Sequence, residues 1–312
     1  MAQENNICRF HQNIERLLAF IPFDRQVSAI FVNYCFFMKN QFTYLIAALM
    51  ITFLFASCKN DESSNTDADA PAAAPVATIG YSVVKVYPHD TAAFTQGLVI
   101  YKGQLYEGTG GSDADTQGKG SYLMRVNLET GRPEKELKLP GQYFGEGITI
   151  LNDTVYQLTW TSKVVFAYTL PDFKKVKEFS INTEGWGITH NGKELIVSDG
   201  TSNLYFYDPS SFQLLRSQSV TAGGELLGNI NELEYIDGFV YANQWGSPFI
   251  FKIDPNDGQV KGRIDFSQII SRLGFINDSD KVLNGIAYDA DTKKIYITGK
   301  LWPELYEIQL GQ

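Results

Sequence analysis

Residues 144–160, FGEGITILNDTVYQLTW, contain the unit that decides the fold. The pair Glu146-Gly147 precedes a short apolar strand, a polar turn follows, and a second apolar strand ends at Trp160. Related units recur along the chain, and each opens on a dipeptide in the corresponding place: Gln96-Gly97, Glu146-Gly147, Trp186-Gly187, Asn231-Glu232 and Asn284-Gly285. Their spacings are 50, 40, 45 and 53 residues. Strand-rich repeats of about 40–50 residues are typical of the blades of a β-propeller.

The remainder of the chain from Gly80 to Leu310 also favours an all-β fold. Apolar segments such as residues 121–126 and 249–253 alternate like strands, and helical periodicity is confined to residues 266–273. Five units over this span give about 46 residues each, and a sixth blade would need about 40 more. We therefore predict a five-bladed β-propeller over residues 80–312. Its last strand, at residues 305–310, should complete a blade with a strand from the N-terminal region and so close the ring.

Composition excludes several classes of protein. Of the 312 residues, 44% are hydrophobic and 20% are charged, which is enough apolar material for a packed core. The net charge of −9 argues against nucleic-acid binding, which needs a basic surface. With three cysteines and three histidines, a metal centre built from these ligands is not expected. The default expectation for the assembly is a monomer.

The first 79 residues are predicted to serve export and membrane attachment and to lie outside the propeller. Residues 38–57 combine a basic start, an apolar run of about a dozen residues and small residues at the end, which is typical of a signal peptide. The end resembles a lipobox, which would make Cys58 the lipidated first residue of a lipoprotein, followed by a flexible linker over residues 58–79. Residues 1–37 are interpreted as an over-extended N-terminus. We expect a membrane-anchored protein of the cell envelope, on the periplasmic face or the cell surface.

The five dipeptides should converge on a central funnel, because equivalent residues of propeller blades lie at the same radius and height. Their first residues supply one carboxyl, three amides and one indole. A second set is expected at the same rim 11 to 16 residues later: Glu107, Trp160, Asp199, Trp245 and Lys300. All four tryptophans, including Trp302, fall at or near these two sets. Aromatic walls around one carboxyl suit a small polar ligand such as a peptide end, and burial should raise the pKa of Glu146 into a range useful for proton transfer.

An ordered series of motifs connects the sequence with a known family. The motifs are residues 94–98, 144–147, 158–160, 186–187, 198–201, 231–234, 242–245, 282–287 and 298–303, or FTQGL, FGEG, LTW, WG, SDGT, NELE, ANQW, VLNGIA and TGKLWP. Each motif alone is weak, but the ordered set from Tyr81 to Leu310 resembles the plant and bacterial type of glutamine cyclotransferase (glutaminyl-peptide cyclotransferase).

The resemblance implies an acyltransferase of the aminoacyltransferase class that converts the N-terminal glutamine of peptides to pyroglutamate with loss of ammonia. It implies that Glu146 holds the α-amino group and moves its proton to the departing nitrogen. It implies that Asn231 and Lys300 polarise the γ-carbonyl and that Gln96 orients the amide. The residues that would form the walls of the substrate pocket are Phe94, Phe144, Trp160, Trp186 and Trp245. This scheme requires no metal or other cofactor.

Two other functions remain open on the residues alone. A metal-dependent propeller lactonase, esterase or phosphotriesterase could hold a divalent ion with Glu146, Asn231 and Asn284, although tryptophan walls would be unusual there. A non-catalytic surface propeller could bind a peptide or glycan without reaction.

Several residues also have structural interpretations. Glu146 could be an ordinary rim carboxylate paired with Lys300. Structural roles are expected for Glu107, Asp199, Glu232 and Glu234. The Asp-rich turns at residues 113–115 and 277–280 could hold a structural Ca²⁺.

Overall fold

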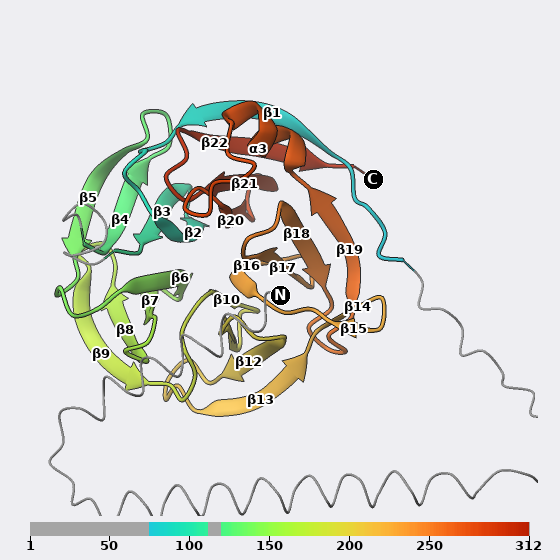
Figure 1. The fold of residues 1–312 in the computed structure, drawn as a ribbon. Coiled ribbons are helices and arrows are strands. Elements are labelled where there is room, and N and C mark those ends of the chain that lie inside the picture. Colours follow the sequence, from blue (N-terminus) through green and yellow to red (C-terminus); the bar gives the residue numbers. More distant parts are fainter. Residues whose placement is uncertain (1–74, 112–119, 312) are drawn as a thin grey trace, which may run out of the picture. The chain divides into compact units, whose positions relative to one another are not determined.

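The computed structural model describes residues 75–111 and 120–311, in which five four-stranded antiparallel sheets surround a common centre (Figure 1). This arrangement confirms the predicted all-β, five-bladed propeller. The expected N-terminal extension, signal peptide, Cys58 and the turn at residues 113–115 lie outside the described residues. Within the described residues, no helix has the length and apolar character needed to cross a membrane.

Each blade begins with a strand at the centre of the ring, and these inner strands carry the five dipeptides or directly follow them. The inner strands are β2 (Thr95–Tyr101), β6 (Gly145–Leu151), β10 (Ile188–His190), β16 (Ile230–Ile236) and β20 (Leu283–Asp289). The second strands are β3 (Gln104–Thr109), β7 (Thr154–Thr159), β11 (Leu195–Ser198), β17 (Phe239–Gln244) and β21 (Lys294–Gly299).

The third and fourth strands of each sheet lie progressively farther from the centre (Figure 1). The third strands are β4 (Tyr122–Asn127), β8 (Val164–Thr169), β12 (Asn203–Tyr207), β18 (Phe249–Ile253) and β22 (Glu304–Leu310). The outer strands are β5 (Arg132–Lys138), β9 (Lys174–Ser180), β13 (Leu214–Ser219), β19 (Val260–Asp265) and β1 (Tyr81–Pro88). The short strands β14 (Thr221–Ala222) and β15 (Glu225–Leu226) form a separate hairpin, and α3 (Ser267–Leu273) follows β19.

The ring closes as the sequence predicted. In the fifth blade, β22 pairs with β21 on one side and with β1, from the start of the domain, on the other. The β1–β22 ladder runs from the pair Tyr81–Leu310 to the pair Pro88–Glu304. A blade completed by both ends of the domain removes the open sheet edge that would otherwise remain between the first and last strands.

Hydrophobic side chains fill the space between every pair of neighbouring blades, so the core consists of five layers. In the layer between blades 1 and 5, for example, Leu98 and Leu105 pack with Tyr296 and Leu305. Because each blade is covered on both faces, its middle strands lack the alternation of apolar and polar residues that marks a half-exposed sheet. In β6, all seven residues are buried.

Contacts with the propeller begin slightly before Gly80, within the segment that the sequence assigns to the linker. Thr78 forms a parallel bridge with Arg263 of β19, and the Ile79 amide donates to the Arg263 carbonyl at 2.7 Å. The Arg263 amide donates in turn to the Ala77 carbonyl at 2.8 Å. The segment before β1 is thus held against the fourth blade by backbone hydrogen bonds, which are largely independent of side-chain identity and leave little trace in the sequence.

The glycines of the dipeptides allow the inner strands to approach closely around the centre. A Cβ added to Gly97 would lie 2.3 Å from the Ile148 nitrogen of blade 2, and one added to Gly187 would lie 2.1 Å from the Asn231 oxygen of blade 4. Only glycine permits such contact between neighbouring backbones. Glycine therefore permits the close approach of the inner strands in blades 1 and 3, whereas blade 4 has Glu232 in this place, and the residue before the glycine is free to vary.

Candidate active site

The first residues of the dipeptides lie at the inner ends of the five blades. Gln96, Glu146, Asn231 and Asn284 are buried, and Trp186 is partly buried. In four blades the pairing of the inner strand with the second strand shifts at this point, between Thr95 and Gly97 in blade 1 and between Gly145 and Ile148 in blade 2, for instance. Such bulges re-aim side chains and are common beside active sites.

A chain of amide hydrogen bonds fixes the orientation of Glu146. The Asn284 Nδ2 group donates to Gln96 Oε1 at 3.3 Å and to the Thr95 carbonyl at 2.9 Å. This contact leaves the Gln96 Nε2 group to donate to Glu146 Oε1 at 3.1 Å. Three of the five blades thus cooperate to hold one carboxyl, and that carboxyl receives its hydrogen bond from a neutral donor.

Burial raises the pKa of Glu146 well above the ordinary value for a glutamate. The positive charge of Lys300 opposes this shift, and the carboxylate of Glu184 adds to it. A carboxyl that is removed from water and only partly compensated holds its proton more tightly than usual, so it can serve as an acid as well as a base. The expectation of a raised pKa at this position therefore agrees with the structure.

Lys300 is buried close to the same centre. It follows β21 directly, its backbone amide donates to the Val282 carbonyl at 2.9 Å, and its Nζ atom lies 4.5 Å from the centroid of the Phe94 ring. Burial lowers its pKa to about 8, while the charges of Glu146 and Asp280 act in the opposite direction. The side chain is thus mostly charged at neutral pH, and the aromatic face of Phe94 helps to hold it.

Aromatic rings form most of the rim of the funnel. The centroids of Phe94 and Phe144 are 6.3 Å apart, and those of Phe144 and Trp160 are 5.7 Å apart. Trp186 meets Trp245 edge to face at 6.4 Å. Trp160 and Trp245 are 41% and 45% exposed, which leaves apolar surface free at the opening. Exposed indole faces around a buried polar centre can surround the end of a peptide, while the polar groups of the peptide reach the Glu146 carboxyl.

Glu184 is a rim residue that the sequence did not lead us to predict. Its Oε2 atom accepts hydrogen bonds from the indole nitrogens of Trp160, at 2.7 Å, and Trp186, at 3.0 Å. One carboxylate therefore holds two walls in place and also contributes negative charge near Glu146. The signal was present in the repeat, because the residue two positions before each dipeptide also lies at the rim: Phe94, Phe144, Glu184, Asn229 and Val282.

Asn231 has hydrogen-bonding capacity to spare. Its side-chain Oδ1 atom is buried and has no partner among the described residues, whereas its backbone oxygen accepts from Ser198 Oγ at 2.6 Å. A buried polar atom without a protein partner costs free energy unless a ligand or water satisfies it. The Asn231 Oδ1 atom could therefore accept a hydrogen bond from a bound group.

The second set of rim residues directly follows the second strand of each blade, which corrects one member of the predicted set. Backbone amides at this position donate to the residue two before the dipeptide: Gly110 to Phe94 at 2.9 Å, Trp160 to Phe144 at 3.0 Å, Trp245 to Asn229 at 2.8 Å and Lys300 to Val282 at 2.9 Å. Blade 1 thus places Gly110 at the rim, not Glu107. A Cβ at Gly110 would lie 2.3 Å from the Phe144 ring, so the ring occupies the space of the missing side chain.

The side chains of Glu107 and Trp302 do not line the rim. Glu107 pairs with Leu98 inside the blade and accepts from Thr95 Oγ1 at 2.7 Å, and it lies 3.1 Å from the His89 ring. Trp302 is completely buried, and its indole nitrogen donates to the Lys281 carbonyl at 2.9 Å. Its backbone amide donates to the Gly299 carbonyl at 3.1 Å, so Trp302 lies near Lys300 as expected, but its ring packs in the core and forms no wall of the funnel.

Glu232 and Glu234 have the structural roles expected of them. Glu232 stands where the other four blades have glycine, and its two oxygens accept from the backbone amides of Leu98, at 3.3 Å, and Ile286, at 2.8 Å. Glu234 accepts from the Tyr288 amide at 2.8 Å and from Thr189 Oγ1 at 3.4 Å. Through these two carboxyls, blade 4 is tied to the inner strands of three other blades, which are β2 of blade 1, β10 of blade 3 and β20 of blade 5.

The described residues include no group of three or more His, Cys, Asp or Glu side chains placed to hold a metal ion. In the turn at residues 277–280, Asp278 accepts from the backbone amides of Asp280 and Lys281 at 3.0 and 3.2 Å. Asn284, one of the three groups considered for a divalent ion, directs its Nδ2 group into the chain of amides that holds Glu146.

The fold and the funnel together define a class of protein, a five-bladed propeller with a buried acid–base group inside an aromatic rim. Comparison with known proteins then gives the family. Residues 49–310 match the family model described as glutamine cyclotransferase. A glutaminyl-peptide cyclotransferase of Arabidopsis thaliana is 42% identical over 236 residues, which are 74% of this chain and 71% of that protein. The chain belongs to the glutamine cyclotransferase family.

A solved structure supports the same assignment. The crystal structure of the glutaminyl cyclase of Myxococcus xanthus matches with a TM-score of 0.70 and 35% sequence identity, covering 76% of this chain and 98% of that one. The family resemblance recognised from the ordered motifs is thereby confirmed. The roles of individual residues do not follow from these similarities and are argued from the geometry below.

Proposed function

We propose that the funnel converts the N-terminal glutamine of a peptide to pyroglutamate with release of ammonia, and that Glu146 carries the proton between the two nitrogens. The observation on which the mechanism rests is the burial of Glu146 inside the aromatic rim, with the neutral amide of Gln96 as its hydrogen-bond donor. Membership of the glutamine cyclotransferase family supports the overall reaction.

The first step is the preparation of the nucleophile. A substrate ammonium and a Glu146 carboxylate share one proton, and only the form with a neutral amine can attack the γ-carboxamide. Because burial disfavours the charged form of Glu146, the pocket favours transfer of the proton from the ammonium to the carboxyl. Burial therefore favours the state in which the substrate amine is neutral and Glu146 is protonated.

Ring closure and loss of ammonia follow within one molecule. The amine forms a bond to the carbonyl carbon of the γ-carboxamide, which is Cδ of the glutamine, and the carbonyl electron pair moves to its oxygen, beside which we place the Lys300 ammonium and the Asn231 amide. Glu146 gives its proton to the departing nitrogen and takes one from the ring nitrogen, after which the carbonyl re-forms and NH₃ leaves. Ammonia then takes a proton from Glu146 and becomes NH₄⁺, which restores the carboxylate. Atoms and charge therefore balance.

The energetic contributions of such groups are known in magnitude. Enclosure by aromatic walls favours the folded rotamer of the glutamine side chain, which an intramolecular reaction needs more than a strong nucleophile. General acid–base help contributes about 10²–10⁴-fold in rate, and one oxyanion donor about 10²–10³-fold. In this scheme Gln96 fixes Glu146 and the substrate amide, and the aromatic walls are the five rings named from the sequence.

The reaction can be tested by mass spectrometry of a Gln-initiated peptide incubated with the purified protein. We expect a loss of about 17 Da, the mass of ammonia, together with ammonia in solution. The same assay with a chelator tests the metal-independent scheme, because a lactonase-like centre would lose activity. Binding of the peptide without any loss of mass would instead support the non-catalytic alternative and refute the proposed reaction.

We also propose that Cys58 is lipidated and anchors the protein as a monomer in the cell envelope. Support comes from the sequence of residues 38–58, in which an apolar run and small residues precede the cysteine. Incorporation of a labelled fatty acid into the wild type, and its loss in Cys58→Ala, would test the anchor.

Light scattering of the soluble domain would test the monomer, and calorimetric titration with Ca²⁺ would test a structural ion.

A further inference from the structure

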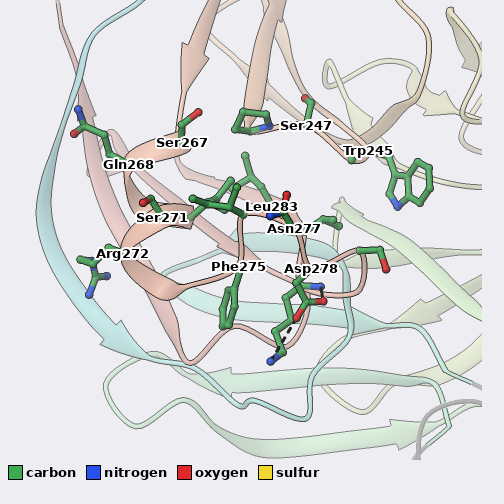
Figure 2. Close-up of a pocket in the computed structure, with 17 residues that line it drawn as sticks. Trp245, Ser247, Ser267, Gln268, Ser271, Arg272, Phe275, Asn277, Asp278 and Leu283 are labelled. Atoms are coloured by element: carbon green, nitrogen blue, oxygen red, sulfur yellow. Dashed lines mark hydrogen bonds and ion pairs between the residues drawn. The ribbon is translucent and has the colours of Figure 1, made fainter.

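A large groove opens beside the catalytic funnel, between blades 4 and 5 (Figure 2). Its volume is about 930 Å³. One side is formed by the turn after β17, from Trp245 to Pro248, and the other by α3 and the segment that leads from it to Leu283. Pockets for small ligands commonly measure about 300–1,000 Å³, so this groove exceeds the needs of a single glutamine side chain.

The rim of the funnel is closed by contacts everywhere except at this groove. Starting from Lys300, the chain of contacts passes through Phe94, Phe144 and Trp160. Glu184 continues it by bridging the indoles of Trp160 and Trp186, and Trp186 contacts Trp245. The remaining interval of the rim lies between Trp245 and Lys300, and the groove occupies that interval.

Rim residues on both sides of the interval border the groove. Trp245 touches Trp186 on the funnel side and lines the groove on the other. Val282 lines the groove and accepts the backbone hydrogen bond of Lys300, and Asn284, two residues further along, belongs to the amide chain that holds Glu146. The groove therefore begins at the rim of the funnel.

The groove is built by an unusually long connection. The segment between β1 and β2 comprises residues 89–94 and that between β5 and β6 comprises residues 139–144, whereas β19 and β20 are joined by residues 266–282, which include α3. The other inner-strand connections have no helix. The additional residues in this one blade form a wall that the propeller itself does not require.

The lining of the groove is suited to apolar side chains. Ile270, Phe275 and Ile276 supply apolar surface, and Ile276 is 66% exposed. The charges present are already paired within the protein, since Arg272 contacts Glu304 and Lys281 lies 3.7 Å from Asp278. Serine hydroxyls, including that of Ser271, provide polar groups at the edge that a peptide backbone could use.

We propose that this groove binds the residues that follow the N-terminal glutamine of a peptide substrate and that it favours apolar side chains there. The inference rests on the proposed function, because it assumes that glutamine occupies the funnel. A peptide whose first residue is enclosed by the rim can continue through the open interval into the groove, and an extended chain advances about 3.3 Å per residue. The next two or three residues would then lie over Trp245, Phe275 and Ile276.

The experiment compares two substrates, Gln-Gly and Gln-Leu-Phe-Leu, by the kcat/KM of ammonia release. For the wild type we expect a tetrapeptide-to-dipeptide ratio of about 10 or more, since each well-placed apolar group contributes about 10-fold or more to discrimination. Ile276→Asp and Ser271→Trp should each lower the ratio about 3–10-fold, by adding a charge or by filling the groove. Leu215→Asp is the matched control, because Leu215 is 54% exposed on the outer strand β13. It should leave the ratio unchanged.

A ratio near 1 in the wild type, or an equal ratio in all variants, would overturn the groove assignment while leaving the proposed reaction intact. If neither peptide loses ammonia, the proposed function fails instead. In that case calorimetry still decides the question of the groove, because Gln-Leu-Phe-Leu should bind about 10-fold more tightly than Gln-Gly to the wild type but not to Ser271→Trp. Equal binding by the two proteins would refute the inference.

Discussion

Glu146 on β6 and Glu232 on β16 lie at the inner ends of blades 2 and 4, and both carboxyls are buried. Burial raises the pKa of each well above its ordinary range. Their partners differ, however. Glu232 uses both oxygens to accept backbone amides from Leu98 and Ile286, whereas Glu146 accepts from the Gln96 side chain at the base of an aromatic rim.

The comparison shows that a perturbed pKa does not by itself identify a catalytic carboxyl. Burial raises the pKa of a carboxyl whether that carboxyl has a structural role or transfers a proton. The distinguishing features are the remaining hydrogen-bonding capacity and access to a ligand. Both oxygens of Glu232 accept from backbones of other blades, whereas Gln96 donates to Oε1 of Glu146 and the proposed reaction uses the other oxygen.

Exchange of Glu146 for glutamine should give the largest effect. Glu146→Gln preserves the shape of the side chain but cannot carry a proton, so we expect kcat to fall about 10²–10⁴-fold with little change in thermal stability. Ammonia release and a thermal melt measure the two quantities. Full turnover by this variant would show that Glu146 does not transfer the proton. Glu146 would then be a structural carboxyl like Glu232.

Lys300 should give the next largest effect and a characteristic pH dependence. Lys300→Met should lower kcat about 10²–10³-fold by removing the charge beside the developing oxyanion. In the wild type, kcat should fall as the pH rises through about 8, because burial lowers the pKa of Lys300 to about 8 and the charged form is the one required. Lys300→Arg should retain the charge and move this fall in kcat to higher pH. If kcat still falls at about pH 8 in that variant, the fall is caused by another group.

Glu232→Gln should affect stability and spare the chemistry. An amide offers one acceptor oxygen in place of two, so one of the backbone amides of Leu98 and Ile286 would lose its partner. We expect a loss of about 1–3 kcal/mol in the free energy of unfolding, measured by denaturant titration, with kcat within about twofold of wild type. A large loss of kcat in a stably folded variant would contradict the proposed division of roles.

The prediction for Glu234 concerns stability alone, as a change in the pH dependence of the free energy of unfolding. Burial raises its pKa from 4.5 to about 8, although hydrogen bonds from Tyr288 and Thr189 oppose the shift. The folded state therefore binds this proton more tightly than the unfolded state, so its stabilisation is present below about pH 4.5 and is lost as the pH rises towards 8. One such proton contributes a slope of at most about 1.4 kcal/mol per pH unit.

Glu234→Gln should flatten that dependence between pH 5 and 8, as followed by denaturant titration at several pH values. Glu129→Gln serves as the control, because Glu129 is exposed and pairs with Lys85 at the surface. Equal slopes in wild type and Glu234→Gln would show that the charge of Glu234 is as stable in the folded protein as in water.

The sequence by itself determined the propeller, the number of blades and the inner ring of site residues. The physical reason is the repeat: every inner strand must pass its neighbours at the centre, so four of the five blades carry glycine at the same place, and the residue before it faces the funnel. Glu146, Asn231, Asn284 and Gln96 could therefore be located by spacing alone. The same reasoning, extended by two positions, would also have found Glu184.

Only the tertiary structure decided which residues cooperate across blades. The spacing placed Glu107 in the rim because it does not show where the second strand ends, and pairing with Leu98 puts it inside the blade. Likewise, the turn after Lys300 carries Trp302 into the core. The hydrogen bonds of Glu232 to blades 1 and 5, and the groove beside Trp245, depend on distances between segments far apart in the chain. A local pattern does not encode such distances, because they are set by the packing of all five blades around one centre.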